Sequence, residues 1–297
     1  MWHRLKKKER QACIEECREI VNMHNYPITV DQICSYFAIT RQGYYKHRRN
    51  FARDKLFESK VLNAVKLIRA DQPQVGCRKL QNMISTLGIT VGRDRLFNIL
   101  RKNKMLSKVY RRKFNSSSNS GSVVKYPNLV KAHAPIQEPG EIIASDITVI
   151  YTRKSRLYLA LTSDYFSDYV LGYSLSKDFS TKGPLSALVQ ARKKLGKRRS
   201  AVIHHSDHGS QYTSNLFQDT LRKYGYKTSM TGIGKCYDNP KAERINGVLK
   251  HELGLKRIFR DYEEALLYVR DAIKIYNEKR IITTKEYRTP NEILNVA

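Results

Sequence analysis

The sequence predicts an α/β domain with a mixed sheet, preceded by all-helical segments. Three observations lead to this prediction. Apolar residues recur at helical spacing up to about residue 106, three strand-like runs with short connections follow residue 141, and helix-like and strand-like segments alternate after residue 182. Residues 115–122, Asn-Ser-Ser-Ser-Asn-Ser-Gly-Ser, have nothing to bury, so they indicate a linker between the two parts.

The first part begins with an expected helix over residues 10–22, which a Tyr-Pro pair ends. Thr29 is a candidate N-cap for a short second helix, and a basic helix is expected over residues 41–49. This pattern is typical of a helix-turn-helix, although short helix pairs that merely pack together are also common. The side chains that we expect to contact DNA are those of Arg41, Lys46, Arg48 and Arg49.

A second group of helices is expected between residues 56 and 106, with Gly88-Ile89-Thr90 as the turn before its last helix. That helix carries Arg93 and Arg95, which we predict to contact DNA, although a charged helix face is more often simply solvated. The predicted organisation is a helix-turn-helix-like segment at 1–50, a second one at 51–106, a basic Ser/Asn-rich linker at 107–135, and an α/β domain with C-terminal helices at 136–297.

The α/β domain is expected to open with a three-strand antiparallel meander, because three β-rich runs follow one another with short connections. Helices and strands then alternate, which indicates a mixed sheet. Asp238-Asn239-Pro240 suits the start of a further helix, since Pro has no backbone donor to lose at the first helical position. The expected elements are strands at 142–151, 157–162 and 169–175, a helix at 182–195, a strand at 201–205, a helix at 214–224 and a strand at 226–230.

The charge of the chain indicates a polyanionic partner. The 55 Lys and Arg residues outnumber the 27 acidic ones and give a net charge of +28, which is costly in self-repulsion unless nucleic acid or a similar partner offsets it. Residues 1–140 hold 28 of the basic and 10 of the acidic residues, so the first half is the stronger candidate for binding DNA. A ribosome-associated or generally basic housekeeping protein is the alternative on charge alone.

Other site classes find little support in the sequence. No apolar run approaches the roughly 18 to 20 residues of a membrane span, and a cytoplasmic, unprocessed protein is expected. The five cysteines include no Cys-x-x-Cys pair and indicate reduced thiols, with a metal shared by Cys13 and Cys17 as a weaker alternative. No Gly-x-x-x-x-Gly-Lys motif is present, so ATP is not expected.

Three acids stand where the predicted layout brings them together: Asp146 within a strand, Asp207 just after a strand, and Glu243 in the first turn of a helix. A carboxylate among apolar neighbours is costly to bury without a cation, hydrogen bonds or water. Carboxylate oxygens suit Mg²⁺ and Mn²⁺, and a pair of such ions supports phosphoryl transfer. Each acid alone also has a structural interpretation, as the cap of a bulge, a turn or a helix N-terminus.

The helix that carries Glu243 has a coherent polar face, because Asn246, Gly247 and Lys250 follow Glu243 at i+3, i+4 and i+7. We expect Lys250 to hold DNA phosphate beside the acids, and we also expect DNA contacts from Lys241, Arg244 and Asn246. His204, His205 and His208 surround Asp207, and packing or hydrogen bonding to the site is expected of them more than metal binding.

The segments around these acids read His205-Ser-Asp-His-Gly-Ser-Gln-Tyr212, Gly234-Lys-Cys-Tyr-Asp-Asn-Pro-Lys-Ala-Glu243 and Leu249-Lys-His-Glu252. Between Asp207 and Glu243 lie 35 residues (243 − 207 − 1). These motifs resemble the integrase core of the insertion-sequence-3 family of bacterial transposases, whose acid spacing is shared with retroviral integrases. Asp146-Ile-Thr148 resembles the family's first-acid segment, and Lys250 stands where the family keeps a basic residue.

The resemblance implies a ribonuclease H-like fold, with a mixed five-stranded sheet and flanking helices. It implies that Asp146, Asp207 and Glu243 are the catalytic residues and the ligands of two Mg²⁺ ions, for which Mn²⁺ can substitute. The implied activity is DNA cleavage and strand transfer by a bacterial, nucleoid-associated protein of the cytoplasm. The implied partners are double-stranded DNA at element ends and target, further copies of the chain on DNA, and an upstream product joined by frameshift fusion.

The resemblance covers nearly the whole chain. Residues 55–106 resemble the family's helix-turn-helix insert, and residues 276–280 resemble part of its C-terminal signature. Residues 74–78, Gln-Val-Gly-Cys-Arg, depart from a more usual Tyr-Gly-Tyr-Arg-like string. Two other functions stay open at this point: a catalytically inactive DNA-binding regulator of transposition, and a metal-dependent structure-specific nuclease.

Overall fold

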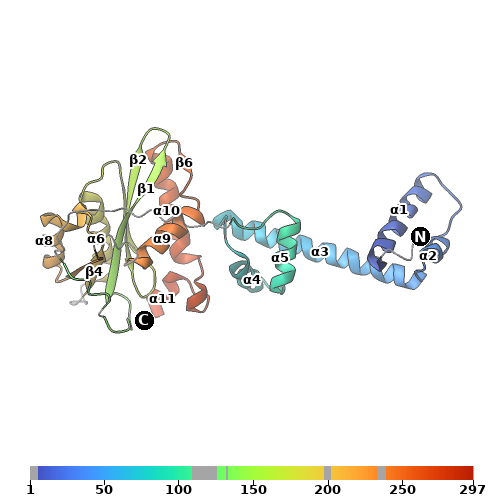
Figure 1. The fold of residues 1–297 in the computed structure, drawn as a ribbon, viewed down its shortest axis with the longest axis horizontal. Coiled ribbons are helices and arrows are strands. Elements are labelled where there is room, and N and C mark those ends of the chain that lie inside the picture. The colour runs from blue at the N-terminus through green and yellow to red at the C-terminus, as the bar shows by residue number, and fades with distance from the viewer. Residues whose placement is uncertain (1–5, 109–125, 132, 197–201, 233–238, 297) are drawn as a thin grey trace. The chain divides into compact units, whose positions relative to one another are not determined.

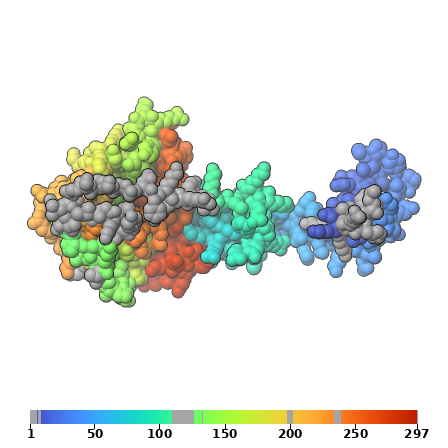
Figure 2. All heavy atoms as spheres, in the orientation of Figure 1, coloured from blue at the N-terminus to red at the C-terminus, as the bar shows by residue number. Residues whose placement is uncertain are grey.

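The computed structural model describes residues 6–108, 126–131, 133–196, 202–232 and 239–296. The chain divides into two compact units, residues 1–65 and 66–297. Figure 1 draws both as a ribbon, and Figure 2 draws the same units with all heavy atoms. Within the described residues, no helix has the length and apolar character that crossing a membrane requires.

The first unit is helical, as the sequence predicts. It contains α1 (Lys7–Met23), α2 (Val30–Tyr36) and the first part of α3 (Arg41–Asp71). Thr29 caps α2 by accepting a hydrogen bond from the Gln32 backbone, so the predicted N-cap is confirmed. The helices bury a small apolar core together with the ring of Tyr44, whose hydroxyl accepts a hydrogen bond of 2.7 Å from Arg18.

The expectation of two separate helices within residues 41–71 is wrong, because α3 runs through this range without a break. The physical reason lies in the composition: no glycine or proline occurs between Tyr44 and Asp71, and most of these residues tolerate a helix well. The helix therefore passes through residue 50, where a domain limit was predicted. The four predicted domains, 1–50, 51–106, 107–135 and 136–297, therefore remain predictions.

The second unit starts with a helical module, by which we mean residues 66–108. It comprises the end of α3, then α4 (Cys77–Thr86) and α5 (Arg93–Lys102). Both short helices are amphipathic, and each buries an apolar stripe that includes Leu80 in α4 and Leu96 in α5. The opposite face of α5 is exposed to solvent and carries Arg93 and Arg95.

The sheet that follows has five main strands in the order β3-β2-β1-β4-β5. The first three strands pair antiparallel, while β4 and β5 pair parallel, which confirms the predicted mixed five-stranded sheet. A two-residue strand, β6 (Ile258–Phe259), was not predicted and pairs with the far end of β1. The main strands are β1 (Ile142–Thr152), β2 (Arg156–Asp164), β3 (Val170–Ser176), β4 (Ile203–Ser206) and β5 (Lys227–Met230).

Helices cover both faces of this sheet (Figure 1). On one face, α6 (Lys182–Leu195) and α8 (Asn215–Lys223) bury an apolar cluster with the sheet, and the short α7 (Ser210–Thr213) precedes α8. On the other face, α9 (Pro240–His251) and α10 (Tyr262–Glu278) form the larger cluster. The chain ends with a 3-10 turn, η3 (Thr283–Lys285), and α11 (Pro290–Val296).

One close approach in this packing requires a glycine. A Cβ atom added at Gly172 of β3 would lie 2.1 Å from the backbone oxygen of Ala187 in α6. No side chain fits there, so the absence of a Cβ lets α6 lie directly against the strand. The helices on both faces of the mixed sheet agree with the flanking helices that the family resemblance implies.

Candidate active site

The first two acids of the predicted triad lie side by side at neighbouring strands. β1 and β4 pair in parallel, with Ile142 opposite Ile203 and Ala144 opposite His205. Asp146 stands four residues after Ile142, and Asp207 stands four residues after Ile203. The shared register therefore places both acids at the same level, where β4 ends and its chain leaves the sheet.

The third acid, Glu243, lies in the first turn of α9, which begins at Pro240. Two side-chain amides attach this helix to β1. Asn239, just before the helix, donates to the backbone oxygen of Ser145 at 3.1 Å, and Asn246 donates to the Asp146 carboxylate at 2.7 Å. Because these contacts flank Glu243 along the chain, they hold the first turn of α9 next to the strand that carries Asp146.

The electrostatics of Asp146 also connect the three acids. Burial raises the pKa of Asp146 to about 7, and the negative charges of Asp207 and Glu243 add to this effect. The hydrogen bond from Asn246 acts in the opposite direction because it stabilises the charged form. The three carboxylates therefore share one neighbourhood, in which Asp207 and Glu243 disfavour the charged form of Asp146.

Lys250 lies within reach of this charge. Burial lowers the pKa of Lys250, and the attraction of Asp146 partly offsets the shift. Its side chain is half-buried on the last turn of α9, seven residues after Glu243. The predicted polar face of the helix is thus present, with Asn246 buried against Asp146 and Lys250 near the same carboxylate.

The chemistry of this donor set fits a hard divalent cation. Three carboxylates supply oxygen ligands of the kind that Mg²⁺ and Mn²⁺ prefer, and a cation would relieve the raised pKa of Asp146. In the described part of the chain, no three His, Cys, Asp or Glu side chains already form a cluster with metal-binding geometry. Of the predicted motif before Glu243, residues 234–238 lie outside the described residues.

Of the three histidines near Asp207, His204 and His205 make internal hydrogen bonds, whereas both ring nitrogens of His208 are buried without a hydrogen-bond partner in the described part of the chain. His204 Nε2 lies 2.9 Å from the hydroxyl of Ser145, and His205 Nδ1 lies 2.9 Å from the hydroxyl of Ser229. Both histidines are buried, and burial lowers the pKa of His204 to about 3, so its ring is neutral near pH 7. For His204 and His205 this agrees with the packing and hydrogen-bonding role expected from the sequence, and the neutral ring of His204 contacts Ser145, the residue before Asp146.

Two residues predicted to contact DNA are engaged inside the protein. Lys241 and Arg244 of α9 both form ion pairs with Asp168, which is 1% exposed and adopts a left-handed backbone conformation with φ of 62°. Part of the Arg244 side chain still faces solvent. The remaining predicted contacts are exposed on other helices: Arg41, Lys46, Arg48 and Arg49 on α3, and Arg93 and Arg95 on α5.

Two acids for which the sequence predicts no role, Asp168 and Glu252, form ion pairs that involve α9 or its C-terminal end. Asp168 follows the end of β2 and holds the cations at the start of α9, as described above. Glu252 is the C-cap residue of α9, and its carboxylate accepts hydrogen bonds from Lys79 at 3.0 Å and from Arg280 at 2.8 Å. Glu252 belongs to a motif quoted above, but only the tertiary contacts give it a function in the fold.

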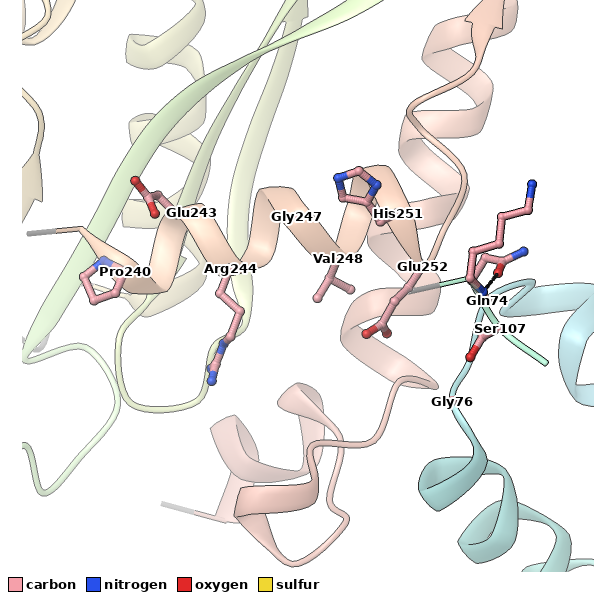
Figure 3. A pocket seen from close by; sticks show the side chains of 11 residues that line it. Gln74, Gly76, Ser107, Pro240, Glu243, Arg244, Gly247, Val248, His251 and Glu252 are labelled. Atoms are coloured by element: carbon pink, nitrogen blue, oxygen red, sulfur yellow. Dashed lines mark hydrogen bonds between the residues drawn. The ribbon is translucent and has the colours of Figure 1, made fainter. Parts of the chain in front are cut away.

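A cavity of about 640 Å³ runs along α9 from Pro240 and Glu243 to Glu252 (Figure 3). One wall is the helix itself, where Gly247 leaves open space because a Cβ there would meet nothing within 4 Å. The other wall belongs to the helical module and includes Gln74 and Ser107. The catalytic candidate Glu243 and the helical module therefore border the same cavity.

The chain is similar to known integrase and transposase proteins over the residues that hold the three acids. Two family models, each described as an integrase core domain, match residues 136–236 and 224–290. An insertion element IS600 protein of 31 kDa from Shigella sonnei is 32% identical over 84% of this chain and 92% of its own length. The transposase for insertion sequence element IS904 of Lactococcus lactis is 30% identical over 73% of this chain and 86% of its own length.

Solved structures with similarity include the catalytic core domain of HTLV-2 integrase in complex with magnesium. It has a TM-score of 0.43 and 24% identity, and the match covers 53% of this chain and 98% of that one. The catalytic domain of Mos1 mariner transposase has a TM-score of 0.38 and 19% identity, with 46% of this chain and 70% of that chain covered.

Proposed function

The chain belongs to the insertion-sequence-3 family of transposases with an integrase core domain, and on this basis we propose that it cuts DNA at the ends of its element and joins them to target DNA. The observation that carries the proposal is the approach of Asp146, Asp207 and Glu243 to one another, with each carboxylate contributed by a different element. Carboxylates so arranged are suited to phosphodiester chemistry.

In this proposal Asp146, Asp207 and Glu243 hold two Mg²⁺ ions, for which Mn²⁺ substitutes. When bound, such ions activate the attacking oxygen and stabilise the leaving oxygen of the displaced strand. Asn246 orients the Asp146 carboxylate through the 2.7 Å hydrogen bond, and His204 supports the same strand through Ser145. Lys250 binds a DNA phosphate beside the acids, which its closeness to Asp146 supports.

Double-stranded DNA, both the element end and the target, is the proposed substrate. The net charge of +28 supplies the attraction to phosphate, and the exposed basic faces of α3 and α5 are the proposed contact surfaces. Strand transfer joins two DNA ends to one target, so we further propose that several copies act together on DNA. We also propose that the chain acts together with an upstream product joined to it by frameshift fusion. The proposed location of the protein is the bacterial nucleoid.

Asp207→Asn provides the first test. Asp207 is exposed, so the substitution removes a ligand charge without disturbing the core. We expect the variant to bind element-end DNA as the original chain does and to lose cleavage and strand transfer in Mg²⁺ or Mn²⁺. Asp219→Asn, an exposed aspartate of α8 away from the triad, is the matched control and should keep both activities.

The same assay separates the alternatives. Cleavage that persists in Asp207→Asn would contradict the assignment of the triad. A regulator would bind the DNA ends without cutting them in any variant. A structure-specific nuclease would cut branched DNA and join nothing.

A further inference from the structure

Glu252 ends the helix that carries Glu243 and connects it to the helical module of residues 66–108. Its two carboxylate oxygens accept hydrogen bonds from Lys79 of α4 at 3.0 and 3.3 Å. The same oxygens accept hydrogen bonds from Arg280, which follows α10, at 2.8 and 3.2 Å. One carboxylate thus joins the module, the C-terminal end of α9 and the end of α10.

This ion-pair cluster is shielded from water. The side chains of Lys79 and Arg280 are 14% and 10% exposed, and that of Glu252 is 29% exposed. Burial alone would raise the pKa of Glu252, but Arg280 and Lys79 outweigh it and the pKa is lowered. Glu252 is therefore charged near pH 7 and its carboxylate lies between Lys79 and Arg280, while burial lowers the pKa of Lys79.

Further hydrogen bonds join the helical module to the end of α9 and to the residue after α10. The backbone N–H of Gln74 donates to the backbone oxygen of Glu252 at 3.4 Å, and the buried side chain of Gln72 donates to the backbone oxygen of Lys279 at 3.3 Å. Lys279 also donates to Asp71 at 2.6 Å. Of the two charged module residues named here, Lys79 is 14% exposed and Asp71 is 44% exposed.

These contacts can affect function because they lie on the helix that carries Glu243. Glu243 and Glu252 are nine residues apart on one helix, and an α-helix is stiff over this length. The cavity along α9 has Glu243 near one end and Gln74 and Ser107 of the module near the other (Figure 3). A movement of the module would change both this cavity and the placement of α5, with its exposed Arg93 and Arg95, relative to the acids.

We propose that Glu252 is a positioning residue that fixes the helical module against the end of α9 through Lys79, so that DNA bound by α5 reaches the acids in one register. The inference rests on the proposed function, because it assigns the module the task of delivering the substrate. It gives Glu252 and Lys79 no contact with the reacting atoms. Their effect is on where, and how fast, the bound DNA is cut.

Lys79→Met in the 297-residue chain is the cleanest test, because it removes the charge on the module side and leaves Glu252 paired with Arg280. Lys79→Arg is the conservative rescue, and Lys66→Met, an exposed lysine of the same module, is the control for general loss of positive charge. Three quantities are measured on labelled element-end DNA: the dissociation constant, the single-turnover cleavage rate and the distribution of cut positions. Hydrogen exchange of residues 74–80 reports whether the module stays docked.

We expect Lys79→Met to bind DNA like Lys66→Met, to cut it up to roughly 100-fold more slowly with a spread of cut positions, and to lose exchange protection at residues 74–80. Lys79→Arg should restore rate, position and protection. The proposal is overturned if Lys79→Met cuts at the original rate and position, if Lys66→Met shows the same loss, or if cutting falls while protection remains.

These results separate this inference from the proposed function. If Asp207→Asn abolishes cleavage and Lys79→Met changes nothing, the positioning role fails and the transposase assignment stands. If the original chain binds element ends and never cuts them, the proposed function fails. The exchange protection of residues 74–80 then still decides whether Lys79 holds the module in place.

Discussion

Asn246 of α9 donates a hydrogen bond of 2.7 Å to the carboxylate of Asp146 on β1, and the two residues stand 100 positions apart in the chain. This contact attaches the helix of the third acid to the strand of the first. The Asn246 side chain is buried, although it belongs to the polar face of α9. The carboxylate it holds has a pKa raised to about 7, so the hydrogen bond stabilises a charge that burial and two neighbouring acids oppose.

Asn246→Ala should therefore lower the free energy of unfolding by about 1.5–3 kcal/mol, the usual contribution of a hydrogen bond to a charged group. Urea unfolding at pH 8, where Asp146 is mostly ionised, measures the difference. Asn295→Ala, on the exposed side of α11, is the control and should leave stability nearly unchanged. Equal stabilities for both variants would mean that the contact with Asp146 contributes nothing.

His204 predicts a specific dependence of stability on pH. Burial lowers the pKa of His204 to about 3 in the folded chain, whereas an unfolded histidine titrates near 6.5. Between these values the unfolded chain binds the proton and the folded chain does not, so stability falls as the pH drops below about 6.5. The slope from this one group approaches about 1.4 kcal/mol per pH unit.

The free energy of unfolding in urea is measured at pH 7 and at pH 5 for the original chain and for His204→Gln. The variant should lose less stability over this interval, whatever its stability at pH 7, because it lacks the titrating group. If the free energy of unfolding falls by the same amount between pH 7 and pH 5 in both chains, His204 is not neutral and buried in the folded protein.

Two glycines of the integrase core domain should respond oppositely to alanine. Gly172→Ala places a methyl group against the backbone oxygen of Ala187 and should destabilise the fold by about 1–3 kcal/mol. Gly247→Ala meets open space on α9 and should stabilise it by about 0.5–1 kcal/mol. Thermal or urea unfolding of the pair measures both, and a loss at Gly247 as large as that at Gly172 would refute the packing described here.

The exposed face of α5 predicts a salt-dependent contact with DNA. If Arg95 binds one phosphate, Arg95→Ala should reduce the slope of log K against log salt concentration by about 0.9. Arg244→Ala should change this slope less, because Arg244 is already paired with the buried Asp168. Arg270→Ala, on the exposed side of α10, is the control, and a slope unchanged by Arg95→Ala would remove α5 from the interface.

The sequence by itself determined the strands, most of the helices and the place of Asp146, Asp207 and Glu243 on them. Alternation, helical periodicity and capping residues are local signals, and they report on backbone geometry within a few residues. They placed one acid in a strand, one after a strand and one in a first helical turn, as the structure does. The metal-binding role of these acids stays a prediction.

Tertiary structure alone decided which side chains the site uses as supports. Asp168 forms ion pairs with Lys241 and Arg244, Asn246 donates a hydrogen bond to Asp146, and Glu252 accepts one from Lys79, 173 residues away in the chain. Such contacts depend on how helices pack on the sheet, and polar side chains on a helix look alike in sequence whether they face solvent or a buried carboxylate. The free energy of burying a charge becomes defined only when its surroundings are formed, so no local pattern encodes it.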